Sequence, residues 1–153
     1  INSAPLHDIG KITIPDAILN KPGRLDDAEF EIMRSHAAAG RDIISNIIDM
    51  VPDSDFLKEA RDLAAHHHER CDGKGYPDRL SGEEIPLSAR IMAVADVFDA
   101  LVSKRSYKDG FPFEKAMSII REGIGTQFDP QVAEAFMRSA DRVREVAESF
   151  KES

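Results

Sequence analysis

The chain has 153 residues, 42% of them hydrophobic, and a formal net charge of −8. This length supports one domain with a hydrophobic core, the single cysteine excludes an intrachain disulfide framework, and no apolar run reaches the roughly 20 residues of a membrane span. The acidic charge argues against DNA binding, which depends on clustered Lys and Arg, although a metal ion could still attract a small phosphorylated ligand. We therefore expect a cytoplasmic protein without membrane insertion.

Helical periodicity dominates the chain, and no segment shows the sustained alternation of a half-buried strand. We predict an all-α fold, a bundle of about six to eight helices. In chain order we expect helices over 7–11, after Pro15, over 26–50, 55–70, 87–103 and 113–123, and a last helix from Asp129. We assign residues 1–140 to one domain and expect the charged segment 141–153 to extend the last helix into solvent. Because only six residues precede His7, we expect this domain to belong to a longer protein.

Two helix starts carry specific signals. Asp26 stands three residues before Glu29 at the start of the long helix, which is the spacing of a capping box. Asp129 is followed by Pro130, which predicts an N-cap with proline at the first helical position. Between residues 72 and 86, glycines and prolines predict a loop.

The histidines fall on inward faces of the predicted helices. At about 100° of rotation per residue, the apolar stripe of helix 26–50 includes His36. The buried face of helix 55–70 continues onto His67, with His68 on its flank and His66 turned away, so we predict that His66 is a bystander. Taken alone, a histidine on an apolar face is more often a hydrogen-bonded core residue than a ligand.

Helix 87–103 is apolar nearly all round, which predicts that it is the central element of the bundle. Asp96 and Asp99 interrupt it. A buried carboxylate without a partner is costly, so these two aspartates call for cations, although Asp96 could instead pair with Arg90.

Four separate segments thus place imidazole or carboxylate on inward faces, which favours a metal site over separate structural roles. These side chains suit iron, manganese, zinc or nickel, and a carboxylate such as Asp8, next to His7, can bridge two metals. Two such cations activate water for attack on phosphorus, so we expect phosphate-ester hydrolysis, with Lys11 neutralising a phosphate oxygen or assisting the leaving group. The candidate ligands are His7, Asp8, His36, His67, His68 and Asp96.

The motifs resemble those of the HD-GYP family, a branch of the HD-domain metal-dependent phosphohydrolases, over roughly residues 6–140. The resemblance implies an all-helical HD fold, a bi- or trinuclear centre usually occupied by iron or manganese, and hydrolysis of bacterial cyclic di-GMP to a linear dinucleotide or GMP. It also implies a C-terminal output domain behind a receiver or other sensory module. The matching segments are His7-Asp8-Ile9-Gly10-Lys11, His36, His67-His68-Glu69, Asp72-Gly73-Lys74-Gly75-Tyr76-Pro77 and the helix around Asp96.

Carried over by these motifs, the family's metal ligands fall on the same six side chains. The resemblance further implies roles for residues around the metals. These are Lys11 and Asp99 in proton transfer and phosphate handling, Gly75 and Tyr76 in ligand contact, Arg105 and Lys108 at the phosphates or guanines, and Glu69 and Asp72 in ordering the ligands or the loop.

Two other functions stay open. The same chemistry could act on another cyclic or linear nucleotide. The domain could also be a noncatalytic signalling module that binds a ligand or a partner such as a GGDEF diguanylate cyclase domain. Missing ligands would be the signature of that module, and all six are present.

Overall fold

The computed structural model describes residues 2–103 and 109–149. Within these residues the chain forms helices and no strand, which confirms the predicted all-α fold. In chain order the elements are η1 (Ala4–Leu6), η2 (Ile9–Thr13), α1 (Asp16–Leu19), α2 (Asp27–Met50), α3 (Asp55–His66), η3 (Gly82–Glu84), α4 (Leu87–Val102), α5 (Phe113–Glu122), α6 (Pro130–Arg138) and α7 (Ala140–Ser149), where η denotes a short 3-10 helix.

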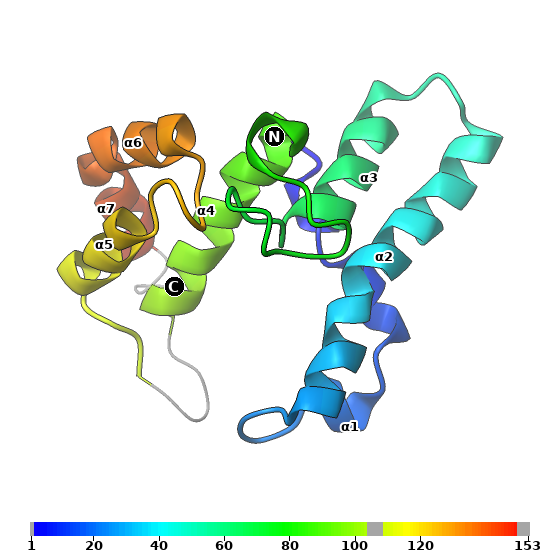
Figure 1. Ribbon diagram of the computed structural model, residues 1–153, viewed down its shortest axis with the longest axis horizontal. Helices are drawn as coiled ribbons and strands as arrows, with labels where there is room; N and C mark the ends of the chain where they lie inside the picture. Colours follow the sequence, from blue (N-terminus) through cyan, green and yellow to red (C-terminus); the bar gives the residue numbers. More distant parts are fainter. Residues whose placement is uncertain (1, 104–108, 150–153) are drawn as a thin grey trace.

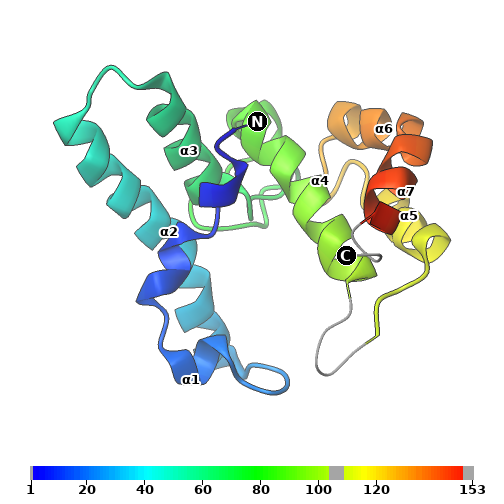
Figure 2. The ribbon, with the colours of Figure 1, turned by 180° about the vertical axis from the view of Figure 1, so that it is seen from behind.

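Helix α4 is the central element, as predicted. The pair formed by α2 and α3 lies on one side of it, and α5, α6 and α7 lie on the other (Figures 1 and 2). Each side has its own apolar cluster. Ile44 packs with Ala60 and Ala64 between α2 and α3, whereas Phe98 of α4 packs with residues of α5 and α6, including Ile120. Helices α3 and α4, which carry candidate ligands, contact each other between the two sides.

Both predicted helix starts are confirmed. The backbone N–H of Glu29 donates to Asp26 Oδ1 at 2.8 Å, and the N–H of Asp26 donates to Glu29 Oε2 at 2.8 Å, which completes a capping box. Asp129 caps α6 by accepting from the Val132 N–H at 3.0 Å. Among the described helices, none is both long and apolar enough to cross a membrane.

We expected one helix over 7–11, and this prediction is wrong. His7 and Asp8 form the turn between η1 and η2, and the N–H of Lys11 donates to the Asp8 carbonyl oxygen at 2.9 Å. Gly10 explains the departure in part, because glycine disfavours a helix and here brings the backbone directly against α2. A Cβ at Gly10 would lie 1.8 Å from the carbonyl oxygen of His36.

Helix α3 ends at His66, four residues before the predicted end. The Glu69 carboxylate stabilises the loop that follows instead of a further helical turn, because it accepts hydrogen bonds from the backbone N–H groups of Asp78 at 2.7 Å and Leu80 at 3.1 Å. His67 is the C-cap, and the two residues after it lie outside the helix.

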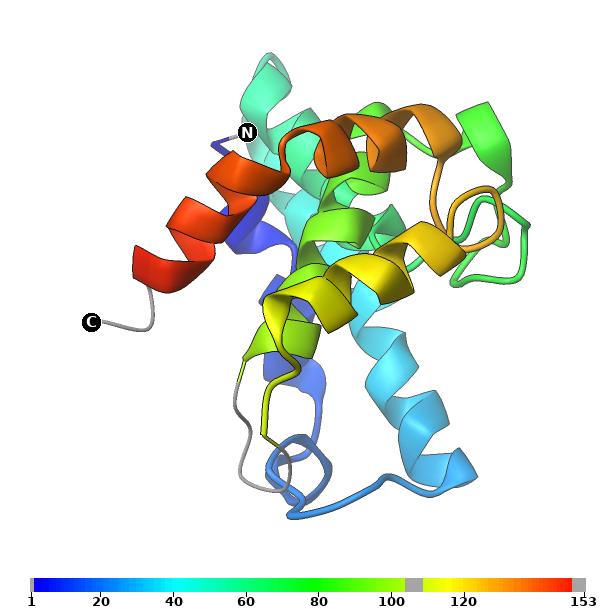
Figure 3. The same cartoon turned by 90° about the vertical axis from the view of Figure 1, so that its left-hand side faces the viewer.

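The segment after α6 does not extend that helix into solvent. The helix ends at Arg138, and α7 takes a new direction (Figure 3). Val143 and Ala147 of α7 pack on the apolar cluster formed by α4, α5 and α6. Arg144 forms an ion pair with Glu114, and its guanidinium carbon lies 4.0 Å from the ring centre of Phe113. The apolar positions within this charged segment therefore hold it on the bundle.

The contact at Gly10 gives a first prediction. Gly10→Ala should lower the free energy of unfolding by about 2 kcal/mol or more, because the added methyl overlaps the backbone of α2. Ile12→Ala in the same 3-10 helix should change it by less than about 0.5 kcal/mol, because Ile12 is 77% exposed. Urea unfolding of both variants measures this, and equal effects would contradict the close packing at Gly10.

Candidate metal centre

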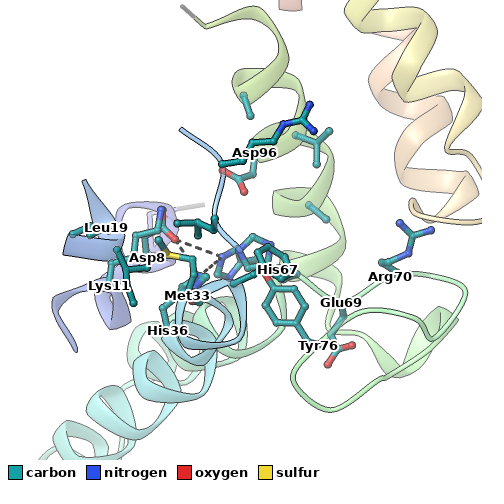
Figure 4. A pocket seen from close by; sticks show the side chains of 18 of the residues that line it. Asp8, Lys11, Leu19, Met33, His36, His67, Glu69, Arg70, Tyr76 and Asp96 are labelled. Carbon is teal, nitrogen blue, oxygen red and sulfur yellow. Dashed lines mark hydrogen bonds and ion pairs between the residues drawn. The ribbon is translucent and has the colours of Figure 1, made fainter. Parts of the chain in front are cut away.

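The six predicted ligands come together in one cluster. All of them except His7 line a cavity, and Figure 4 labels Asp8, His36, His67 and Asp96 among its lining residues. The six ligands arrive from the turn between η1 and η2, from α2, from the end of α3 and from α4. The ligand atoms form two overlapping groups, within each of which all atoms lie within 4.8 Å of one another. One group is Asp8, His36, His67 and His68, and the other is His7, His67 and Asp96.

Asp8 belongs to the first group and also contacts His7 of the second. Its Oδ1 is 3.5 Å from His36 Nε2 and 3.6 Å from His67 Nε2, whereas its Oδ2 is 3.3 Å from His7 Nε2. Each carboxylate oxygen therefore faces a different set of imidazoles. This is the arrangement that a carboxylate shared by two cations requires.

Backbone carbonyls fix the orientation of three imidazoles. The Nδ1 atoms of His7, His36 and His67 donate to the carbonyl oxygens of Ala4 at 2.7 Å, Met33 at 2.6 Å and Leu63 at 3.0 Å. Because a carbonyl oxygen only accepts, the proton of each neutral ring resides on Nδ1, and Nε2 presents its lone pair to the cluster. The carbonyl contacts therefore orient all three rings with Nε2 toward the cluster.

The surroundings of His68, Asp96 and Asp8 favour the protonation states in which these side chains bind metals. Burial, followed by the neighbouring His67 and His36, lowers the pKa of His68 to about 3, so its ring is neutral at pH 7. Interaction with His7 lowers the pKa of Asp96. Burial raises the pKa of Asp8, but the contacts with His67, His7 and Lys11 outweigh it and hold that pKa far below its usual range.

His7 is the exception among the histidines. Its interactions with Asp8 and then Asp96 raise its pKa to about 10, so the ring is protonated at pH 7 when these carboxylates are its partners. A metal bound through Nε2 must displace this proton. Taken together, four imidazoles and two carboxylates in this arrangement fit a pair of divalent transition-metal ions.

The cavity beside the cluster has a volume of about 850 Å³. Lys11 lines it, with its Nζ 2.7 Å from Asp8 Oδ2. Three further basic side chains, which the sequence did not single out, also line it: Lys21, Arg24 and Arg70. Lys21 and Arg24 belong to the turn before α2. Two basic residues in one turn were the sequence signal that could have pointed to them.

The loop after α3 contributes Tyr76 to the cavity. Its ring stacks on His68, with the centroids 4.9 Å apart and the planes 20° apart. Gly75, which we predicted to contact the ligand, is buried and is not among the residues that line the cavity. It allows the loop to pack closely on the end of α3, because a Cβ there would lie 2.6 Å from the His68 carbonyl oxygen. Glu69 and Asp72 order the loop through backbone N–H groups, the latter accepting from Lys74 at 3.1 Å.

The structure does not bring Asp99 to the cluster. Asp99 lines a second cavity on the α7 side of α4, and it accepts from the Ser103 hydroxyl at 3.3 Å. Arg105 and Lys108 lie outside the described residues. His66 belongs to neither group of predicted ligands; its Nδ1 lies 3.7 Å from both Glu69 Oε1 and Asp78 Oδ2, with which it forms a separate group.

The chain is thus an all-helical domain in which imidazoles and carboxylates from four segments form a cluster that could hold metal ions. The sequence profile of the HD domain family matches residues 2–132, and the chain belongs to this family.

Relatives of known description agree with the predicted HD-GYP branch. A cyclic di-GMP phosphodiesterase of Vibrio cholerae is 48% identical over 99% of this chain, and the cyclic di-GMP phosphodiesterase response regulator RpfG of Xanthomonas campestris is 43% identical over 97%. A 3'3'-cGAMP-specific phosphodiesterase of Vibrio cholerae is 44% identical over 92%. The chain spans 31%, 38% and 26% of the lengths of these three relatives.

The adjacent histidines at the end of α3 provide a matched test of the ligand set. His67→Ala should lose at least one equivalent of bound metal, because His67 belongs to both groups of ligand atoms. His66→Ala should retain the metal content of the unaltered protein. Elemental analysis of the purified variants decides the point, and equal losses would show that His67 has no special part in the centre.

The raised pKa of His7 makes metal binding pH-dependent. Since Asp8 and Asp96 are already ionised and His68 is neutral, His7 is the ligand that must lose a proton at pH 7. The association constant for Mn²⁺ should therefore rise about tenfold per pH unit between about pH 7 and 9. Calorimetry in buffers of different ionisation enthalpy should detect about one released proton per chain at pH 7, and binding without proton release would contradict the account.

Proposed function

We propose that this domain hydrolyses the phosphodiester bonds of cyclic di-GMP to a linear dinucleotide or GMP, in a metal-dependent reaction of bacterial second-messenger signalling. The single observation that carries the proposal is the Asp8 carboxylate, whose two oxygens face different imidazoles at the wall of a cavity. Relatives described as cyclic di-GMP phosphodiesterases support the substrate.

The proposed centre holds two ions, which the resemblance and the nitrogen-oxygen donor set favour as iron or manganese, with zinc or nickel compatible. His7 and Asp96 would hold one ion, and His36, His67 and His68 the other, with Asp8 shared. His67 faces both groups, so it sits at the junction of the two. When bound, such ions stabilise phosphate charge as Lewis acids and lower the pKa of water.

The chain's own residues would bind and orient the substrate. Lys11 carries a cation at the Asp8 edge of the cluster, where it can neutralise a phosphate oxygen or assist departure of the leaving group. Tyr76 forms part of the cavity wall, and Arg24 and Arg70 add positive charge to it. Arg105 and Lys108 remain predicted contacts for the phosphates or guanines. Of the two predicted catalytic groups, the geometry supports Lys11, because Asp99 lines the other cavity.

A second candidate substrate is 3'3'-cGAMP, because a relative specific for it is 44% identical to this chain. It shares the cyclic dinucleotide frame and differs in one base, so the metal centre would serve both. The intact set of six ligands argues against a noncatalytic module. An upstream receiver or sensory module and a GGDEF-type partner remain predictions, of which the first is supported by the response regulator RpfG. A cytoplasmic location is also a prediction.

Incubation of metal-loaded protein with each dinucleotide, followed by chromatography, tests the proposal. We expect a linear dinucleotide or GMP from cyclic di-GMP, at a kcat/KM above that for 3'3'-cGAMP. Asp8→Ala should abolish turnover and lower metal content. Metal-loaded protein that hydrolyses neither compound would refute the proposed reaction, and faster turnover of 3'3'-cGAMP would reassign the substrate.

Lys11 separates catalysis from metal binding. Lys11→Met should lower kcat at least about 100-fold, because it removes the cation beside the Asp8 edge of the cluster. The bound metal should remain, because the six ligands are unchanged. Steady-state kinetics with elemental analysis on the same sample measures both, and full activity would exclude a role for Lys11 in the reaction.

A further inference from the structure

Arg34 lies behind the cavity wall, next to two aromatic rings that form part of that wall. Its guanidinium carbon is 4.5 Å from the ring centre of Tyr76 and 5.9 Å from that of Phe30. Both rings line the cavity beside the metal cluster, whereas Arg34 is not among the lining residues. Arg34 therefore contacts the wall without reaching the space that a substrate would occupy.

Two ring contacts are found for the Tyr76 side chain in the described part of the chain, one with His68 and one with Arg34. Its ring stacks on His68, and its backbone N–H donates to the His68 carbonyl oxygen at 3.4 Å. Among residues 2–103 and 109–149, no hydrogen-bond partner is found for the phenol hydroxyl. The guanidinium of Arg34 links this loop ring to helix α2.

Arg34 also pairs with a residue of its own helix. Its Nη1 lies 2.6 Å from Glu31 Oε1, one turn earlier on α2, and its side chain is only 28% exposed. Two residues later the same helix supplies His36 to the metal cluster. The series Glu31, Arg34, Tyr76 and His68 therefore connects α2 to a proposed metal ligand through the ring of Tyr76.

We propose that Arg34 is a positioning residue for the reaction: it holds the Tyr76 ring against His68 and so sets the shape of the cavity wall that receives the substrate. The inference rests on the proposed hydrolysis of a cyclic dinucleotide and adds a residue that acts through Tyr76. A guanidinium over an aromatic face is attracted by the ring quadrupole, and this attraction strengthens as water is excluded. The exposed ion pair with Glu31 alone contributes little free energy, so it does not account for the position of Arg34 over the Tyr76 ring.

The kinetic test uses variants that remove and restore the cation. Arg34→Met keeps a long side chain without charge and should raise KM about tenfold while leaving kcat within about twofold and metal content unchanged. Arg34→Lys should recover much of the loss, because an ammonium group also binds an aromatic face. Arg61→Met is the matched control, since Arg61 pairs with its neighbour Asp62 at 2.8 Å on α3, and it should change neither constant.

A double-mutant cycle tests whether Arg34 acts through the ring. In a Tyr76→Leu background, Arg34→Met should have no further effect on KM, because the ring that Arg34 positions is gone. Effects that multiply independently would overturn the inference, as would an Arg34→Met variant with unchanged KM.

A readout that does not require turnover separates this inference from the proposed function. The chain has two tyrosines, Tyr76 and Tyr107, so labelling the zinc-loaded protein with tyrosine that carries ¹³C only at Cζ gives two ring signals, which Tyr76→Phe assigns. Arg34→Met should shift the Tyr76 signal and leave the other in place. An unmoved Tyr76 signal would overturn the role of Arg34 whatever the activity, whereas a shifted signal without hydrolysis of either dinucleotide would refute the proposed reaction alone.

Discussion

The division of the Asp8 carboxylate between two sets of imidazoles is the interaction on which the site depends. One oxygen faces His36 and His67, and the other faces His7 and Lys11. This geometry requires the N-terminal turn to lie directly on α2, and Gly10 permits it by having no side chain at the point of contact. A small shift of that turn would separate Asp8 from the helices that supply its partners.

The surrounding helices contribute more than position. The carbonyl groups of Met33 and Leu63 accept from Nδ1 of His36 and His67, so the same backbone that builds α2 and α3 also orients the ligand atoms. The early end of α3 has a similar consequence. It leaves His68 outside the helix, where the ring can face the cluster on one side and stack with Tyr76 on the other.

Periodicity and capping signals were sufficient for the helical elements and for the inward faces of His36 and His67, because both depend on local geometry along one helix. They failed where distant contacts decide the structure. The packing of α7 depends on Val143 meeting α4 and α6, and the 3-10 turns at the N-terminus depend on docking against α2. The contact of Arg34 with Tyr76 joins residues from different elements, so no pattern within either segment could predict it.

Anomalous diffraction from crystals of the manganese-loaded protein, recorded on both sides of the manganese edge, tests the central claim most directly. The account predicts two peaks separated by the Asp8 carboxylate, one beside His7 and Asp96 and the other beside His36, His67 and His68. A single peak, or two peaks that do not share Asp8, would contradict the two-metal centre and the chemistry derived from it.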